Sequence, residues 1–197
     1  MSALSFSPSK PLFHEAFTQN SAQLRTITQI TMFVAGIAAL SLSAHVKIPF
    51  YPVPVTMQTL IVLMIGMSYG ARLGGATILG YLAAGAAGAP VFAGGSGIVY
   101  MMGTTGGYLA GFFISAVIMG LLAERGWGRN WMTTALAMLA GSAIIYLCGV
   151  SWLSSFIGLE KAVTFGLLPF IYGDLLKLII ATAALPMAWS VLGRRNR

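Results

Sequence analysis

Residues 169–177 read Pro-Phe-Ile-Tyr-Gly-Asp-Leu-Leu-Lys and lie within an apolar run from Gly166 to Leu192. This run is long enough to cross a membrane as a helix, which takes about 20 apolar residues. It nevertheless contains one acid and one base, Asp174 and Lys177. Their spacing of three residues places both side chains on one face of the helix. The run therefore predicts a membrane-spanning helix with a charged pair on a single face.

The charged pair needs a physical reason, because a charged side chain within a span costs roughly 2.5–3.5 kcal/mol on insertion scales. One reason is mutual neutralisation, in an ion pair that faces the interior of a helix bundle. The other is a binding site, in which Lys177 meets an anionic group and Asp174 accepts from N–H donors. From the residue types alone, both interpretations stay open.

The composition predicts a polytopic membrane protein. The chain has 197 residues, of which 57% are hydrophobic and 8% are charged, and its mean hydropathy is +0.85. A soluble domain carries about 25% charged residues. Six spans of about 20 residues fit this length and leave short loops and one tail. We expect an all-α protein with a cytoplasmic tail at 1–25, a six-helix transmembrane domain at 26–193 and a basic C-terminus at 194–197.

The predicted spans follow six apolar runs, at about 26–46, 53–69 (or 56–69), 73–89, 106–123, 131–153 and 166–192. Arg72 marks a tight turn between the second and the third run. In the first run, Ala35 and Ala39 form a small-xxx-small face on which another helix can approach closely. This face is the candidate interface with a partner protein.

Two of the predicted connections are apolar and irregular. Residues 47–58 contain three prolines in six residues, which prevents regular helix and favours an extended course. Residues 90–107 are rich in glycine, which permits unusual backbone angles and close approach to a ligand. Irregular backbone at membrane depth is tolerated where it lines a cavity. Both connections are therefore expected to cover a pocket.

The basic residues predict the orientation in the membrane. Eight of them fall on the side of the N-terminus: Lys10, Arg25, Arg72, Arg125, Arg129, Arg194, Arg195 and Arg197. Lys47 and Lys161 fall on the opposite side, and Lys177 lies within the membrane. The positive-inside rule then places both termini in the cytoplasm. The pocket, together with Asp174 and Lys177, is expected to open toward the outside.

Five ordered segments carry a family resemblance. They are residues 44–58, which end in Pro-Val-Pro-Val-Thr-Met-Gln; Gly-Ala-Arg-Leu-Gly at 70–74; Gly-Ala-Pro-Val-Phe at 88–92; Thr-Gly-Gly-Tyr-Leu-Ala-Gly-Phe at 105–112; and Pro-Phe at 169–170 with Gly-Asp-Leu-Leu-Lys at 173–177. This set resembles the BioY family, the biotin-specific substrate-binding (S) component of energy-coupling-factor (ECF) transporters. The resemblance covers about residues 26–192. Thr104 departs from it, since many members have proline there.

The resemblance implies a multi-pass protein of the cell membrane that captures biotin from outside. It also implies two kinds of partner, a transmembrane coupling (T) protein and a pair of ABC ATPases. Asp174 and Lys177 match the family's paired acid and base on the last helix. Lys177 would pair with the biotin carboxylate, and Asp174 would accept from the ureido group or would orient Lys177. Further candidates for polar or stacking contacts are Gln58, Tyr51, Tyr100, Tyr172 and Thr105.

Three other interpretations compete with this one. The first is a stand-alone or ion-coupled secondary carrier for a small anionic solute, with Asp174 as a proton site. The second is a structural subunit with an inert charged pair. The third, a membrane enzyme, is disfavoured because two histidines, one cysteine and four acids supply no nucleophile–base set and no metal cluster. No cofactor, no metal and no contact with nucleic acid is expected.

Overall fold

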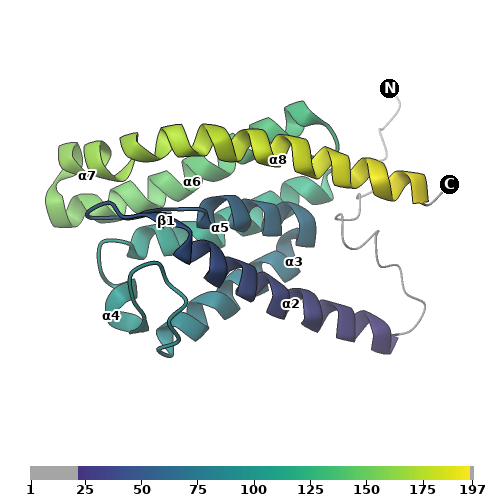
Figure 1. Ribbon diagram of the computed structural model, residues 1–197, viewed down its shortest axis with the longest axis horizontal. Coiled ribbons are helices and arrows are strands. Elements are labelled where there is room, and N and C mark those ends of the chain that lie inside the picture. The colour runs from purple at the N-terminus through teal and green to yellow at the C-terminus, as the bar shows by residue number, and fades with distance from the viewer. Residues whose placement is uncertain (1–21, 196–197) are drawn as a thin grey trace, which may run out of the picture.

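The computed structural model describes residues 22–195, so most of the predicted tail at 1–25 and residues 196–197 lie outside it (Figure 1). The described chain is all-α, as predicted. Its helices are α2 (Ala22–His45), α3 (Gln58–Ala86), α4 (Gly97–Met101), α5 (Gly106–Glu124), α6 (Trp131–Ile157), α7 (Leu159–Gly166) and α8 (Leu168–Arg195). Two short strands, β1 (Lys47–Ile48) and β2 (Val55–Thr56), form an antiparallel hairpin.

Helix α3 contains two of the predicted spans, because the chain reverses within it at Gly70. The backbone there has φ 81° and ψ 174°, a conformation that is essentially open only to glycine. Beyond the reversal the two halves run side by side, since Gln58 Nε2 donates to Tyr81 Oη over 2.6 Å. Five segments of the described chain are long and apolar enough to span a membrane, with α3 counted as one. When α3 is divided at Gly70, these segments correspond to the six predicted spans.

The reversal differs from the prediction by two residues, since Arg72 was expected to mark it. Gly70 is the position that must adopt a positive φ, and the side chain of Arg72 is exposed. The carboxylate of Glu124, at the end of α5, accepts a hydrogen bond of 2.9 Å from the backbone N–H of Ala71. The turn is therefore fixed by a backbone angle and by a contact from a distant helix.

Small residues let the helices of the core approach closely. A Cβ atom placed on Gly66 of α3 would lie 2.6 Å from the carbonyl oxygen of Ala116 in α5. One placed on Gly36 of α2 would lie 2.6 Å from Thr77 Cγ2. Close backbone packing of this kind holds membrane helices together, because lipid provides little hydrophobic drive for their association.

The irregular segments gather at one end of the bundle. Figure 1 shows the β-hairpin, α4 and α7 at the left-hand end, away from the C-terminal end of α8. Two predicted connections are more regular than expected, since 90–107 contains α4 and 154–165 contains most of α7. The first helix also starts at Ala22, rather than at 26. The end that was predicted to carry the pocket thus holds the hairpin and both short helices.

Candidate functional site

A cavity of about 480 Å³, including its open mouth, lies beneath the β-hairpin. We call it the outer cavity. The hairpin supplies its cover, and the walls come from α3, α5, α6, α8 and the segment around α4. Its lining residues are Val53, Pro54, Thr56, Gln58, Thr59, Phe92, Ala93, Tyr100, Thr105, Tyr108, Leu109, Phe112, Tyr146 and Phe170. A mostly apolar lining with a few polar groups is typical of a site for a small organic ligand.

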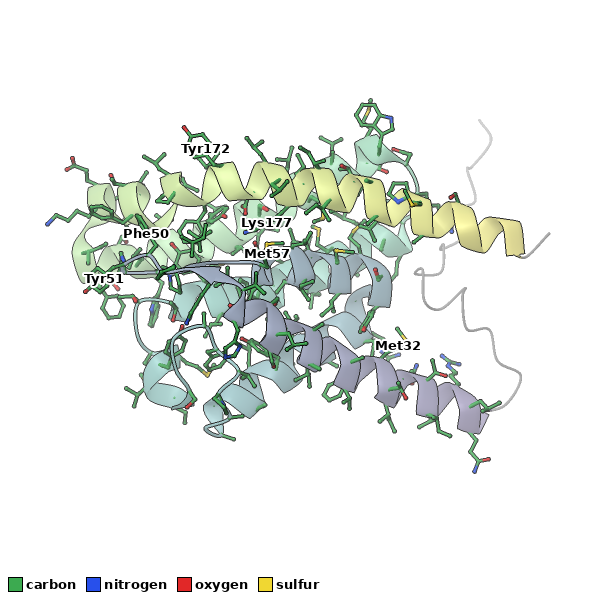
Figure 2. All side chains as sticks on the ribbon, in the orientation of Figure 1. Met32, Phe50, Tyr51, Met57, Tyr172 and Lys177 are labelled. Carbon is green, nitrogen blue, oxygen red and sulfur yellow. The ribbon has the colours of Figure 1, made fainter. Side chains whose placement is uncertain are left out.

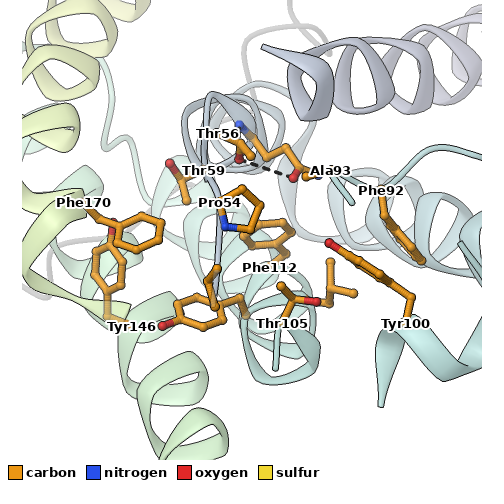
Figure 3. Close-up of a pocket in the computed structure, with 14 residues that line it drawn as sticks. Pro54, Thr56, Thr59, Phe92, Ala93, Tyr100, Thr105, Phe112, Tyr146 and Phe170 are labelled. Carbon is orange, nitrogen blue, oxygen red and sulfur yellow. Dashed lines mark hydrogen bonds between the residues drawn. The ribbon is translucent and has the colours of Figure 1, made fainter. Parts of the chain in front are cut away.

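Six of the 14 residues that line the outer cavity are aromatic, and they lie on both sides of it (Figure 3). Phe92 stacks on Tyr100, with ring centroids 5.3 Å apart and an interplanar angle of 16°. On the other side Tyr146 meets Phe170 edge-on, with centroids 5.9 Å apart. Buried rings of this kind offer flat apolar surfaces to a ligand and position them rigidly.

Gln58 is held in place at the inner edge of the hairpin. Its side chain is 4% exposed and donates to Tyr81 Oη, which in turn donates to the carbonyl oxygen of Val91 over 3.0 Å. Thr56 Oγ1 donates to Gln58 Oε1 over 3.3 Å. The amide is thus oriented by two neighbours and borders the cavity as a fixed polar group.

The charged pair lies behind the outer cavity. Lys177 Nζ lies 2.9 Å from Asp174 Oδ1 and donates to Thr59 Oγ1 over 2.8 Å. The hydroxyl of Tyr146 donates to the other carboxylate oxygen of Asp174. Thr59 lies on α3, Tyr146 on α6 and the pair on α8, so the network joins three helices. Each charge is compensated, as the interior of a membrane protein requires.

A second cavity adjoins the first on the far side of this network. It has about 730 Å³ including its mouth, and Asp174 and Lys177 both line it. Its other walls come from α3, α6 and α8. Thr59 and Tyr146 line both cavities. These two side chains therefore form the wall between the outer cavity and the charged pair.

The predicted site residues fall into three groups. Gln58, Tyr100 and Thr105 line the outer cavity, and Asp174 and Lys177 line the second one. Tyr51 and Tyr172 are 88% and 82% exposed and line neither. Figure 2 shows Tyr172 pointing away from the bundle.

Geometry explains these two placements. Tyr172 precedes Asp174 by two residues, which on a helix is a rotation of about 200°. Tyr51 belongs to the turn that connects β1 to β2, and its side chain is exposed there.

The predicted partner interface lies on the outer side of α2. Ala35 is exposed and Ala39 is half-buried. The buried side of this helix consists instead of Gly36, Leu40, Ser43 and Ala44. Within the described chain, Ala35 is thus left available to another protein.

Several lining residues were not among the sequence-based candidates. Thr59 and Tyr146 have hydroxyl groups within predicted spans, which could have marked them as partners of the buried pair. Phe170 belongs to the stretch that contains the pair. Phe92, Tyr108 and Phe112 lie within the segments of the family resemblance, but only the tertiary structure brings them together.

Three contacts hold the irregular segments above the outer cavity, two of them between these segments and one from α6. Lys47, on β1, donates its ammonium to the carbonyl oxygen of Ala93. Thr104 Oγ1 donates to the carbonyl oxygen of Pro52 over 3.2 Å. Trp152 Nε1, on α6, donates to the carbonyl oxygen of Gly103 over 2.8 Å. Thr104 is the position at which proline was expected from the family pattern, and a proline could not make this contact.

Known proteins share the sequence and the fold of this chain. The profile of the BioY family matches residues 15–194, so the match begins within the predicted tail. The "Probable biotin transporter BioY" of Rickettsia prowazekii is 36% identical over 172 residues, which cover 87% of this chain and 88% of the relative. The "Biotin transporter BioY" of Thermotoga maritima is 38% identical over 151 residues, 75% of this chain and 88% of the relative.

One solved structure has the same fold. It is the S-component for biotin from an ECF-type ABC transporter, solved at 2.1 Å. It matches with a TM-score of 0.76 over 87% of this chain and 95% of the other, at 24% sequence identity. The arrangement of helices described above is therefore that of a known membrane protein.

Proposed function

This chain belongs to the BioY family, and on that basis we propose that it binds biotin and takes part in biotin uptake across the cell membrane. The family match and the two relatives support the proposal, since each covers most of the chain. The five long apolar segments of the described chain support a multi-pass membrane protein. Enzymatic chemistry is no part of the proposal, because the relatives are named as transporters.

The aromatic outer cavity is the observation that carries this proposal. Biotin has an apolar bicyclic ring system, a ureido group and a carboxylate at the end of a short chain. The rings of Phe92, Tyr100 and Phe112 offer an apolar site of suitable kind for the bicycle. The polar groups at its edge, Gln58 and Thr105, are proposed as further contacts.

The wall residues connect this site to the charged pair. A ligand in the outer cavity would contact Thr59 and Tyr146, which line it. Behind them, Lys177 donates to Thr59, and Asp174 accepts from Tyr146. We propose that these four side chains recognise the ureido group together. Tyr51 and Tyr172 are left out of this proposal because both are exposed.

The mode of transport is a further part of the proposal. We propose that the chain acts as an S component, with a T protein and two ABC ATPases as partners. The shared fold supports this assignment, and the exposed Ala35 on α2 offers a small-residue surface for the T protein. Asp174 is bonded to a lysine and a tyrosine, which leaves it poorly suited as the proton site of an ion-coupled carrier.

Uptake into proteoliposomes tests the transport proposal. The chain is reconstituted with and without a T protein and its ATPases, and entry of radiolabelled biotin is followed with ATP inside or with an imposed proton gradient. We expect uptake only with the partners and ATP. Uptake by the chain alone that collapses with the proton gradient would contradict the S-component assignment and support a secondary carrier.

A further inference from the structure

The outer cavity has no cation for an anionic ligand. The 14 residues that line it, all within the described chain, include no charged side chain. Biotin nevertheless has a carboxylate, and an ionised group that leaves water needs a compensating charge or several hydrogen bonds. If the proposed function holds, on which this inference rests, a cation near the cavity is the group best suited to meet that carboxylate.

Lys177 is a poor partner for a second carboxylate. It is 5% exposed, and two of its three N–H donors are used by Asp174 and Thr59. Its charge is already balanced by Asp174 at 2.9 Å. A ligand carboxylate added to this network would leave one uncompensated negative charge at membrane depth, which is costly.

Unlike Lys177, Lys47 is exposed and has a charge that no neighbouring carboxylate balances in the described chain. It lies at the mouth of the outer cavity, because its ammonium donates to the carbonyl oxygen of Ala93, a lining residue. Across the hairpin it pairs with Thr56, which also lines the cavity. Within residues 22–195, its ammonium has no carboxylate at ion-pair distance, so its charge is not balanced there.

We propose that Lys47 binds the carboxylate of the ligand at the mouth of the outer cavity. One N–H donor of its ammonium holds Ala93, and the other two are available for a carboxylate. The same bond fastens β1 to the segment before α4, so the position of the ammonium is fixed before the ligand arrives. The uncharged ureido end then faces Thr59 and Tyr146, where the network is electrically neutral.

An exposed lysine near a membrane surface has another common anionic partner, the phosphate of a lipid headgroup. The two sources differ in what the substitution of Lys47 would change. A lysine that serves only lipid phosphate would not distinguish a charged ligand from an uncharged analogue. A lysine that binds the ligand carboxylate would distinguish them.

The test compares two ligands on four proteins by equilibrium binding in detergent. The ligands are biotin and biotinamide, in which a neutral amide replaces the carboxylate. The proteins are wild type, Lys47→Met, Lys47→Arg and the control Lys161→Met, which removes an exposed lysine of α7 at the same end of the bundle. We expect Lys47→Met to weaken biotin about tenfold or more and to leave biotinamide within about twofold. Lys47→Arg should retain most of the affinity, and Lys161→Met should match wild type.

Two results would overturn the role of Lys47 while biotin binding stands. One is unchanged affinity of Lys47→Met for biotin, and the other is an equal loss for both ligands, which would reflect a displaced hairpin. If the wild-type protein binds neither ligand, the proposed function is overturned, and this inference with it.

Discussion

The ammonium of Lys177 and the carboxylate of Asp174 lie 2.9 Å apart on one face of α8, with side chains that are only 6% and 15% exposed. Thr59 and Tyr146 complete the hydrogen bonding of the two charges from neighbouring helices. The pair is therefore an internal connection between three helices as well as a candidate ligand contact. Both interpretations of this pair that the sequence left open are compatible with the geometry.

Breaking this pair should destabilise the protein more than removing it. Lys177→Met leaves the charge of Asp174 uncompensated within the bundle, and the loss of one partner from a buried pair typically costs about 3–5 kcal/mol. The double variant Asp174→Leu with Lys177→Met removes both charges and should unfold at a higher temperature than either single variant. Thermal unfolding in detergent measures the difference. A double variant less stable than both single variants would contradict an internally compensated pair.

The hydroxyl of Tyr146 should matter for ligand affinity. Tyr146→Phe removes the donor to Asp174 and keeps the ring, and a hydrogen bond to a charged group is worth roughly 1.5–3 kcal/mol. Because this bond orients the Asp174 carboxylate that we propose for recognition of the ureido group, we expect biotin affinity to fall about tenfold or more. Equilibrium binding measures it.

Tyr108→Phe is the matched control for that substitution. Tyr108 lines the same cavity, but its hydroxyl donates to the carbonyl oxygen of Gly166 over 2.8 Å, away from the pair. It should lower stability and leave affinity nearly unchanged. Equal losses of affinity in the two variants would argue against a special role for Tyr146.

The reversal at Gly70 should depend on glycine. At φ 81° and ψ 174°, alanine would be strained by about 1–3 kcal/mol, so Gly70→Ala should lower the free energy of unfolding by that amount. Gly173→Ala is the control, since its Cβ would meet Val55 Cγ1 at an ordinary 3.8 Å and alanine favours helix. Unfolding curves of the two variants should therefore shift in opposite directions. No shift for Gly70→Ala would mean that this turn can relax.

The contact between Thr104 and Pro52 should slow the escape of the ligand. Thr104→Val removes the hydrogen bond that ties the hairpin to the segment before α5, worth about 0.5–1.5 kcal/mol. Dissociation of labelled biotin in a chase experiment should become about twofold to tenfold faster. Thr164→Val, which removes a hydroxyl from α7 at the same end, should not change it. Identical dissociation rates for all three proteins would show that this contact does not retain the hairpin.

The sequence predicted the features that are governed by local composition. Apolar runs located the spans, the prolines of 47–58 indicated an extended segment, and a spacing of three residues placed Asp174 and Lys177 on one face. Each of these depends on neighbours in the chain, such as the length of a run or the period of a helix. The number of spans was recovered because Gly70 divides α3 where an arginine-containing turn was expected.

The parts that could not be predicted depend on contacts between distant segments. Tyr146 is one of several tyrosines in apolar runs, and only the packing of α6 against α8 turns it toward Asp174. The hydroxyl group of Thr59 within a predicted span is visible in the sequence, but its position opposite Lys177, 118 residues further along the chain, comes from the tertiary structure. The side chain of each of these residues has the chemistry for the site, but its placement is a tertiary property.

The central claim is that the purified chain binds biotin beside the Asp174–Lys177 pair. Binding of radiolabelled biotin to wild type, Asp174→Asn and Lys177→Met tests it most directly, with each value expressed per folded protein. We predict tight binding by wild type and a loss of at least about tenfold in both variants. A well-folded wild type that does not bind biotin would contradict the proposed function, and equal binding by all three proteins would contradict the site.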